Sequence, residues 1–125
     1  MKDSGRPVSP HVTIYSFPMA ALTSITNRVT GCILSFGAAG LGAAELVGGS
    51  GTALSIMQTI GSQGLIVSST AKFAVAFPLV YHYGAAIRHL YWDNSPDILT
   101  NESVEKSSQQ LAAGSLALSG ILMFF

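Results

Sequence analysis

The segment from Phe73 to Asp93 constrains the fold of this chain more than any other stretch. From Ala74 it reads AVAFPLVYHYGAAIRHLYWD, which is apolar enough to lie in lipid and yet carries two histidines and an arginine. His82 and His89 are seven residues apart, so at about 100° per residue they lie on nearly the same face of a helix. Ionisable side chains are costly inside a membrane and by default mark a functional site. The segment therefore predicts a membrane helix that carries a site.

The composition agrees with a membrane protein. Of the 125 residues, 49% are hydrophobic and only 10% are charged, whereas a soluble domain has about 25% charged residues. The formal net charge is zero, which argues against nucleic acids and acidic molecules as partners.

The hydrophobic pattern predicts an all-α integral membrane protein with three spanning helices, over about 20–47, 65–92 and 107–125. Residues 1–19 are polar and rich in proline, and we expect a surface arm that lies on the membrane or against a partner. Residues 20–125 form the anchor domain. The GGSGT sequence at 48–52 ends the first helix, 53–63 is a loop or a short interfacial helix, and 94–110 is a solvent-facing connection.

The basic side chains divide unevenly between the two sides of such a fold. Those on the side shared by the amino terminus and the second connection are Lys2, Arg6, Arg28, Arg88 and Lys106. Only Lys72 falls toward the other side. Because inner loops carry the excess of lysine and arginine, this bias predicts that the amino terminus is inside.

Two further features concern the helices themselves. Gly31, Ser35, Ala39 and Ala43 form a stripe of small residues that lets another helix approach closely, although loose packing is the alternative. Pro78 removes a backbone donor and should bend the second spanning helix one turn before His82, either to make room for a flat ligand or only for packing.

The residue types in the second helix suit a haem. A neutral imidazole is a common ligand of haem iron, and an arginine one or two turns away can meet the propionates. By itself this pattern leaves a hydrogen-bonded structural His82 as the stronger reading. Ser24 and Arg28 lie on one face of the first helix and are either helix-packing groups or donors to a ligand. A small transporter or channel is a further class, which the polar content of the first and third helices supports little.

Three motifs together resemble one family. They are RPVSPHVTIY at 6–15, SITNRVTG at 24–31 and HYGAAIRHLYWD at 82–93. In order and spacing they resemble the cytochrome b560 subunit family of succinate dehydrogenase, in its mitochondrial branch, over the region from Arg6 to Asp93. The resemblance implies a three-helix anchor that pairs with a second small membrane subunit, shares one haem b with it, and carries an iron–sulfur and a flavoprotein subunit.

The resemblance to this family also implies a function, as follows. The subunit belongs to a succinate dehydrogenase of the mitochondrial inner membrane, with its amino terminus on the matrix side, or alternatively of a bacterial plasma membrane. It is not catalytic alone and does not bind succinate. It helps to pass electrons from the iron–sulfur subunit to ubiquinone. The alternatives are the anchor of a fumarate reductase that uses a low-potential quinone, and a haem-free structural anchor.

The resemblance also assigns residues. His82 matches the axial haem ligand, with the second ligand supplied by the partner subunit, and the haem propionate region matches Arg28, Arg88 and His89. The ubiquinone site matches Ser24, Arg28, Phe17 and Val12.

The sequence departs from the family pattern at three places, of which one is Pro18, which precedes the usual position of this proline. Asn27 stands where the family usually has a histidine, which puts any proton-handling role there in doubt. The glycine that usually precedes Ile-Arg-His is displaced, because Gly84 stands two residues early.

Overall fold

A computed structural model describes residues 5–125 and contains only helices there, with no strand among the described residues. Lys2 lies outside the described residues. The elements are the 3₁₀-helix η1 (His11–Thr13), α1 (Met19–Gly48), α2 (Thr52–Gly61), α3 (Leu65–Asn94), the 3₁₀-helix η2 (Pro96–Ile98) and α4 (Asn101–Leu122). The predicted all-α class is confirmed.

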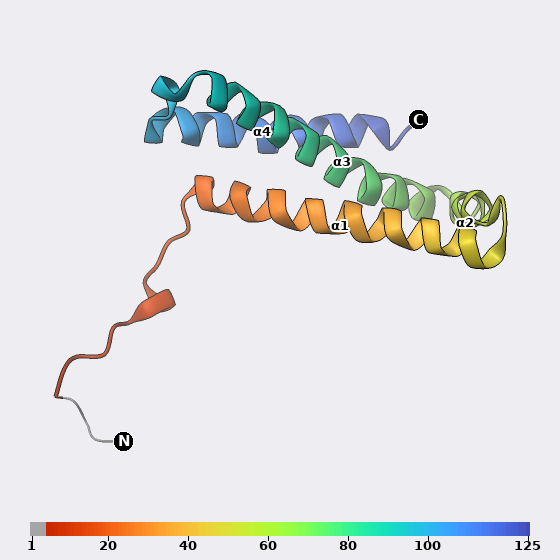
Figure 1. Cartoon of the computed structure of the whole chain (residues 1–125), viewed down its shortest axis with the longest axis horizontal. Helices are drawn as coiled ribbons and strands as arrows, with labels where there is room; N and C mark the ends of the chain where they lie inside the picture. The colour runs from red at the N-terminus through yellow and green to blue at the C-terminus, as the bar shows by residue number, and fades with distance from the viewer. Residues whose placement is uncertain (1–4) are drawn as a thin grey trace.

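The three long helices run alternately along one axis, and α2 lies across the turn between α1 and α3 (Figure 1). Helix α3 packs against both α4 and α1, so it forms the centre of the bundle. The segment before α1 projects away from the helices as an arm with η1 at its middle (Figure 1). The bundle thus brings the first part of α1, the last part of α3 and the first part of α4 to one end.

The turn from α1 to α2 shows why the glycines at 48–52 end a helix. Gly49 and Gly51 have φ angles of 87° and 89°, which residues with a Cβ rarely adopt. The Glu45 carboxylate, in the last turn of α1, accepts hydrogen bonds from the backbone N–H groups of Gly51 at 2.5 Å and Ala53 at 2.8 Å. It therefore satisfies donors that the start of α2 would leave unpaired. Residues 52–61 form a short helix and not a loop, the two alternatives predicted for this segment.

Helix α4 begins earlier than predicted, at Asn101 instead of near Ser107. The Thr100 side chain accepts a hydrogen bond from the Ser103 N–H at 3.2 Å and caps the helix. Glu102 and Lys106, four residues apart, form an ion pair at 2.6 Å on the exposed face. Local capping thus makes 101–110 helical, although these residues are too polar to be counted with an apolar span.

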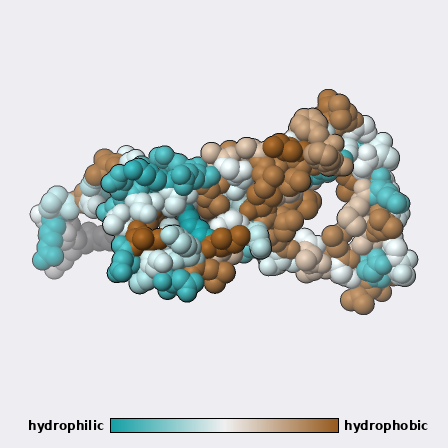
Figure 2. Space-filling view, turned by 90° about the horizontal axis from the view of Figure 1, so that it is seen from above, coloured by the Kyte–Doolittle hydropathy of each residue, from teal (hydrophilic) through white to brown (hydrophobic). Residues whose placement is uncertain are grey.

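Two helices, α1 and α3, are long and apolar enough to cross a membrane. Of their most apolar windows, 0% and 11% of the residues are buried inside the chain, so their apolar side chains face outward. The core helix of a soluble protein would show the opposite. In the space-filling view apolar side chains gather over the middle of the molecule, while polar ones gather at the end that holds the arm and the α3–α4 connection (Figure 2).

Pro78 lies inside α3, which is assigned as one continuous helix from Leu65 to Asn94. The predicted bend at this proline stays a prediction.

Candidate functional site

His82 lies where α3 packs against α1. Its Nδ1 is 3.0 Å from the backbone carbonyl oxygen of Asn27. A carbonyl can only accept, so Nδ1 carries the proton and donates it. In a neutral imidazole the other nitrogen, Nε2, then keeps a free lone pair. Nε2 has no hydrogen-bond partner within the described part of the chain. The arrangement leaves one nitrogen donor available to a ligand.

Tyr81, the residue before His82 in α3, fixes the position of this contact along the axis of α1. The Tyr81 hydroxyl donates to the Thr23 carbonyl oxygen at 3.1 Å, and Tyr81 is only 2% exposed. Thr23 and Asn27 are one helical turn apart on α1. Consecutive residues of α3 therefore bind successive turns of α1, which sets the register between the two helices.

Arg88 lies one turn and a half beyond His82 and is tied to α4. Its Nη1 donates to the Ser108 hydroxyl oxygen at 3.0 Å, and its guanidinium carbon lies 4.5 Å from the centre of the Trp92 ring. The Arg88 Nε is buried and has no hydrogen-bond partner within residues 5–125. Arg88 thus contributes both a structural contact and a buried donor that this chain leaves unpaired.

We did not predict from the sequence that Ser108 would be buried at this contact, although the spacing of the serines in α4 indicates it. The buried polar residues of α4 are Ser108, Ser115 and Ser119. Their spacing of seven and four residues places them on one helix face. A face of serines in an otherwise apolar helix is the usual pattern for close packing between membrane helices.

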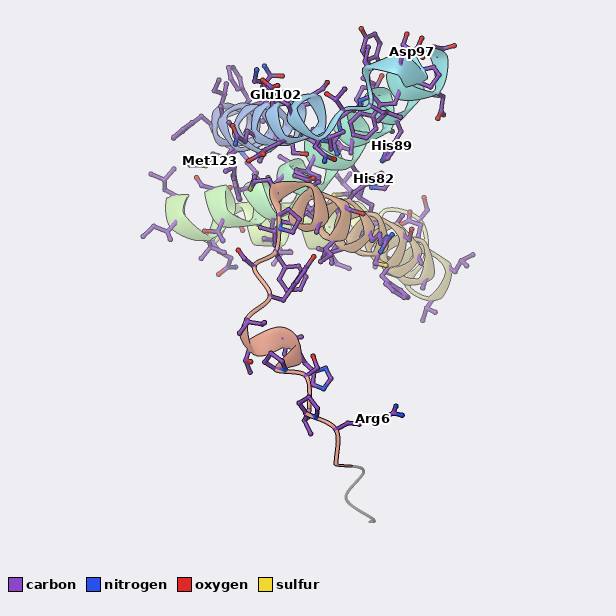
Figure 3. The ribbon with its side chains drawn as sticks, turned by 90° about the vertical axis from the view of Figure 1, so that its left-hand side faces the viewer. Arg6, His82, His89, Asp97, Glu102 and Met123 are labelled. Atoms are coloured by element: carbon purple, nitrogen blue, oxygen red, sulfur yellow. The ribbon has the colours of Figure 1, made fainter. Side chains whose placement is uncertain are left out.

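His89 is exposed on the same side of α3 as His82. Its ring meets Trp92 edge-on, with ring centres 5.3 Å apart and an angle of 90°. Viewed along the bundle, the two histidines lie on one flank of the molecule, opposite to Met123 (Figure 3). The seven-residue spacing had predicted this shared face.

Ser24 and Arg28 lie on α1 and are both exposed. Neither has a hydrogen bond or ion pair with another described residue. The Asn27 side chain beside Arg28 has a buried Oδ1 without a hydrogen-bond partner in this part of the chain. Because Asn27 contacts His82, the structure brings the start of α1 and the histidine flank of α3 together.

The two arm residues are not brought to this site. Val12 and Phe17 are 78% and 51% exposed, and the arm points away from the bundle (Figure 1). The Phe17 ring packs edge-on against Tyr15, with ring centres 4.8 Å apart. Within this chain, Val12 and Phe17 therefore form no wall around Ser24 and Arg28.

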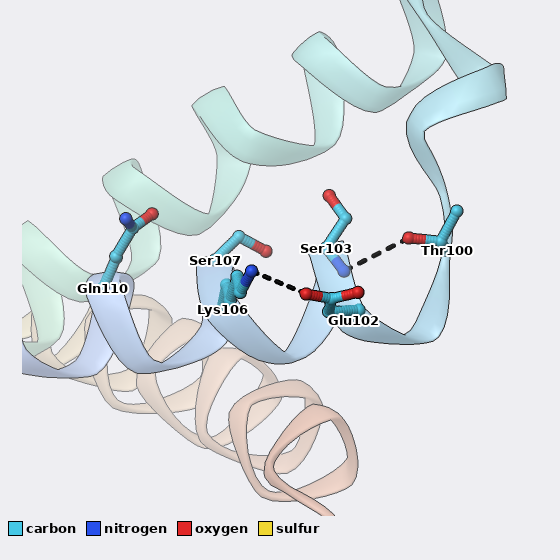
Figure 4. A pocket seen from close by; sticks show the side chains of 6 residues that line it. All are labelled: Thr100, Glu102, Ser103, Lys106, Ser107 and Gln110. Carbon is cyan, nitrogen blue, oxygen red and sulfur yellow. Dashed lines mark hydrogen bonds and ion pairs between the residues drawn. The ribbon is translucent and has the colours of Figure 1, made fainter.

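Two hollows of the molecular surface are not lined by any of these residues. One, of about 440 Å³, lies over the first turns of α4 beside the Glu102–Lys106 ion pair (Figure 4). The most apolar, of about 530 Å³, lies between α2, α3 and α4. Both are open, and the His82 flank is likewise an open surface, as expected where another molecule completes a site.

The donor set fits a shared cofactor better than a self-contained metal centre. Among residues 5–125, no group of three or more His, Cys, Asp or Glu side chains could hold a metal ion. Nε2 of His82 is a nitrogen donor whose tautomer is set by the Asn27 carbonyl, and the unpaired Nε of Arg88 suits an anionic group. A haem held between this chain and a second one requires only a single ligand from each.

Comparison with known proteins gives a consistent result. A family model for the succinate dehydrogenase/fumarate reductase transmembrane subunit matches residues 2–122. The mitochondrial succinate dehydrogenase cytochrome b560 subunit of Dictyostelium discoideum is 38% identical over 99% of this chain and 64% of the relative. The human subunit of the same name is 44% identical over 72% of this chain and 54% of the relative.

A bacterial relative extends the likeness. The succinate dehydrogenase cytochrome b556 subunit of Paracoccus denitrificans is 35% identical over 96% of this chain and 92% of the relative. Against the two mitochondrial relatives, the chain spans between about half and two thirds of their length.

Proposed function

The chain belongs to the family of succinate dehydrogenase and fumarate reductase transmembrane subunits, and on this basis we propose that it is the membrane-anchoring cytochrome b subunit of a succinate:ubiquinone oxidoreductase. The observation that carries the proposal is His82, held against α1 in a membrane-type helix with Nε2 free to bind. The names cytochrome b560 and b556 of the relatives imply haem b in those proteins.

We propose that α1, α3 and α4 all span the membrane. Helix α4 has 22 residues, about 33 Å at 1.5 Å per residue, which suffices for a hydrocarbon core of about 30 Å. Its acidic and basic residues are confined to the first two turns. Its packing along α3 supports a span, because a helix buried against a membrane helix shares that helix's depth.

Toward a haem, His82 would provide one axial nitrogen, and the partner subunit would provide the other. His89 cannot serve as the second ligand, because it lies on the same helix face, about 10 Å along the axis. Arg28, Arg88 and His89 would meet the propionates, since Arg28 and His89 are exposed beside His82 and Arg88 has an unpaired buried donor. When bound, the haem supplies one-electron redox chemistry.

Ser24 and Arg28 would bind ubiquinone. The quinone carbonyl oxygen gains negative charge on reduction and needs donors placed to meet it. A hydroxyl and a guanidinium one turn apart, with no partners inside this chain, supply such donors. Val12 and Phe17 would reach the quinone when the arm folds against the other subunits.

The remaining parts of the proposal concern the assembly. The chain would join a second small membrane subunit, an iron–sulfur subunit and a flavoprotein subunit, in the mitochondrial inner membrane with its amino terminus on the matrix side. It would not bind succinate and would not be catalytic alone. The outward-facing apolar surface of α1 and α3 supports dependence on lipid and partners.

Purification through a tag on this chain tests the function. We expect a flavoprotein and an iron–sulfur protein to co-purify, and the complex to reduce ubiquinone with succinate. A complex that reduces fumarate with a low-potential quinone, and fails to reduce ubiquinone, would favour the fumarate reductase alternative. Recovery of the chain without a flavoprotein, with transport activity in vesicles, would contradict both.

A further inference from the structure

We propose that Gly31 and the backbone carbonyl of Asn27 form a notch on α1 that seats the His82 imidazole, binds its Nδ1 and leaves its Nε2 as the nitrogen available to a ligand. We call these two groups the α1 notch. The inference rests on the proposed role of His82 as haem ligand and adds Gly31 as a positioning residue for it. The three atoms nearest to a Cβ built on Gly31 all belong to His82, so Gly31 would act through the histidine.

The first part of the argument is the lack of space at Gly31. A Cβ built on Gly31 would lie 2.9 Å from Cε1 and 3.3 Å from Nδ1 of His82. Real Cβ atoms essentially never approach closer than 3.0 Å. The obstacle is a ring held by its own hydrogen bond and not the far end of a flexible chain, so any larger residue would push the imidazole out of place.

The second part is the direction of the hydrogen bond. The Asn27 carbonyl lies one turn before Gly31, and its oxygen is 3.0 Å from Nδ1. Turning the ring over about its bond to Cβ would exchange Nδ1 for a carbon and lose this bond. The notch therefore selects both the tautomer and the ring orientation. Hydrogen bonds to the second nitrogen of a ligating histidine orient the ring and raise its basicity as a ligand.

Comparison with the other glycines of α1 singles out this position. Gly37, Gly40 and Gly42 have no atom within 4 Å of a built Cβ, and Gly48, the last residue of α1, would meet only the nearby Thr52 side chain at the turn into α2 among its three nearest atoms. Only at Gly31 does the helix lack a side chain where α3 brings a ring against it. In the predicted stripe of small residues, the first residue, Gly31, therefore makes room for the His82 ring. The other three, Ser35, Ala39 and Ala43, are exposed in this chain.

The test uses the assembled complex with Gly31→Ala and two matched controls. Gly37→Ala makes the same change in the same helix where space is open. Gly84→Ala introduces a Cβ 2.9 Å from Leu111 Cδ1, which is equally close but does not involve His82. Assembly is verified by the flavoprotein content, and it is expected in all three variants because alanine favours helix more than glycine does.

The measured quantities are haem per flavoprotein and the electron paramagnetic resonance spectrum of the ferric haem. We expect Gly31→Ala to weaken haem retention by about 10–100-fold, the usual cost of a lost outer-shell partner, or to shift the ferric spectrum where haem remains. Both control variants should match the wild type. A Gly31→Ala complex that matches the wild type, or a Gly84→Ala complex that changes as much, would overturn the notch.

A measurement on the unmodified complex needs no variant. A proton held between His82 Nδ1 and the part-buried Asn27 carbonyl, at a helix contact that a bound haem would cover, predicts a slowly exchanging ligand proton in electron–nuclear double resonance after transfer to D₂O. A haem whose ligand protons all exchange at once would contradict the notch. A wild-type complex without haem b would contradict the proposed function itself, so the two failures are distinguishable.

Discussion

Ser108 accepts two hydrogen bonds at the end of the bundle where α1 begins and α3 ends, and it shows how single polar residues hold this fold together. Thr23 Oγ1 donates to its hydroxyl oxygen at 3.1 Å, and Arg88 Nη1 donates to the same oxygen at 3.0 Å. Ser108 is 0% exposed. One hydroxyl therefore joins α1, α3 and α4 in surroundings where unpaired polar groups are costly.

Replacing this hydroxyl should destabilise the assembled protein. Ser108→Ala leaves one Arg88 donor without its acceptor and removes the Thr23–Ser108 contact, although the Thr23 hydroxyl keeps the Ala20 carbonyl oxygen at 3.1 Å. We expect a loss of about 1–3 kcal/mol. Thermal unfolding of the purified complex measures the effect. Ser35→Ala, on an exposed face of α1, is the control and should leave the melting temperature unchanged. Equal melting temperatures for the two variants would show that the Ser108 hydroxyl does not stabilise the bundle.

Ser24 and Arg28 allow a separate test at the residue scale. Removing one donor to a charge-developing oxygen typically costs about 10²–10³ in rate. We therefore expect Ser24→Ala and Arg28→Ala to reduce succinate–ubiquinone activity strongly. Succinate oxidation with a dye that accepts electrons at the flavin should be unchanged, and Ser35→Ala should behave as wild type. A parallel loss of dye reduction would point to failed assembly instead of a quinone site.

The site residues differ in how far the sequence could predict them. The shared face of His82 and His89 was predictable, because it follows from helical geometry alone, whereas the role of His82 as a ligand stays a prediction. The contact of Arg88 with Ser108 was not predictable, because it depends on where α4 lies across α3. The positions of Val12 and Phe17 depend on the arm, which carries no periodic signal that ties it to the bundle.

At the scale of elements, the α1–α2 turn depends on one carboxylate. Glu45 accepts from Gly51 N–H and Ala53 N–H and holds the start of α2 against the end of α1. The predicted boundaries of α1 and α3 lie within two residues of the observed ones. Both helices are long apolar runs, and glycines mark the end of α1 and the start of α3. The start of α4 was missed because the cap at Thr100 lies in a polar segment that hydropathy does not distinguish from a loop.

Removal of the Glu45 carboxylate should loosen this turn without unfolding the bundle. In Glu45→Ala we expect faster amide hydrogen exchange at Gly51 and Ala53, because both N–H groups lose their acceptor. Exchange in α3 and α4 should not change. Glu105→Ala, an exposed carboxylate on α4, serves as the control. Unaltered exchange at Gly51 and Ala53 would show that the turn is held by other contacts.

At the scale of the whole molecule, the chain is not a self-sufficient fold. Its long helices direct most of their apolar surface outward, and the His82 flank is open. The fold class followed from composition and helix length. The completed site does not follow from the sequence of one chain, because under the proposed function the groups that cover this flank would belong to other subunits.

The proposed three-span topology predicts which ends share a side of the membrane. In a Cys32→Ala background, Ser50→Cys should react with a membrane-impermeant maleimide added outside mitoplasts. Asp97→Cys should react only after the membrane is permeabilised, since α3 separates the two positions. Phe125→Cys should behave like Ser50→Cys if α4 spans. Reaction of Asp97→Cys and Phe125→Cys from the same side would contradict a third span.

The most direct test of the central claim is the reduced-minus-oxidised absorption spectrum of the purified complex, recorded for His82→Ala beside wild type and His11→Ala. His11 is the matched control, because it is an exposed histidine in the arm and has no proposed contact with the haem. The account predicts a b-type signal in wild type and in His11→Ala, and its loss in His82→Ala while the flavoprotein still co-purifies. A full signal in His82→Ala, or no signal in wild type, would contradict it.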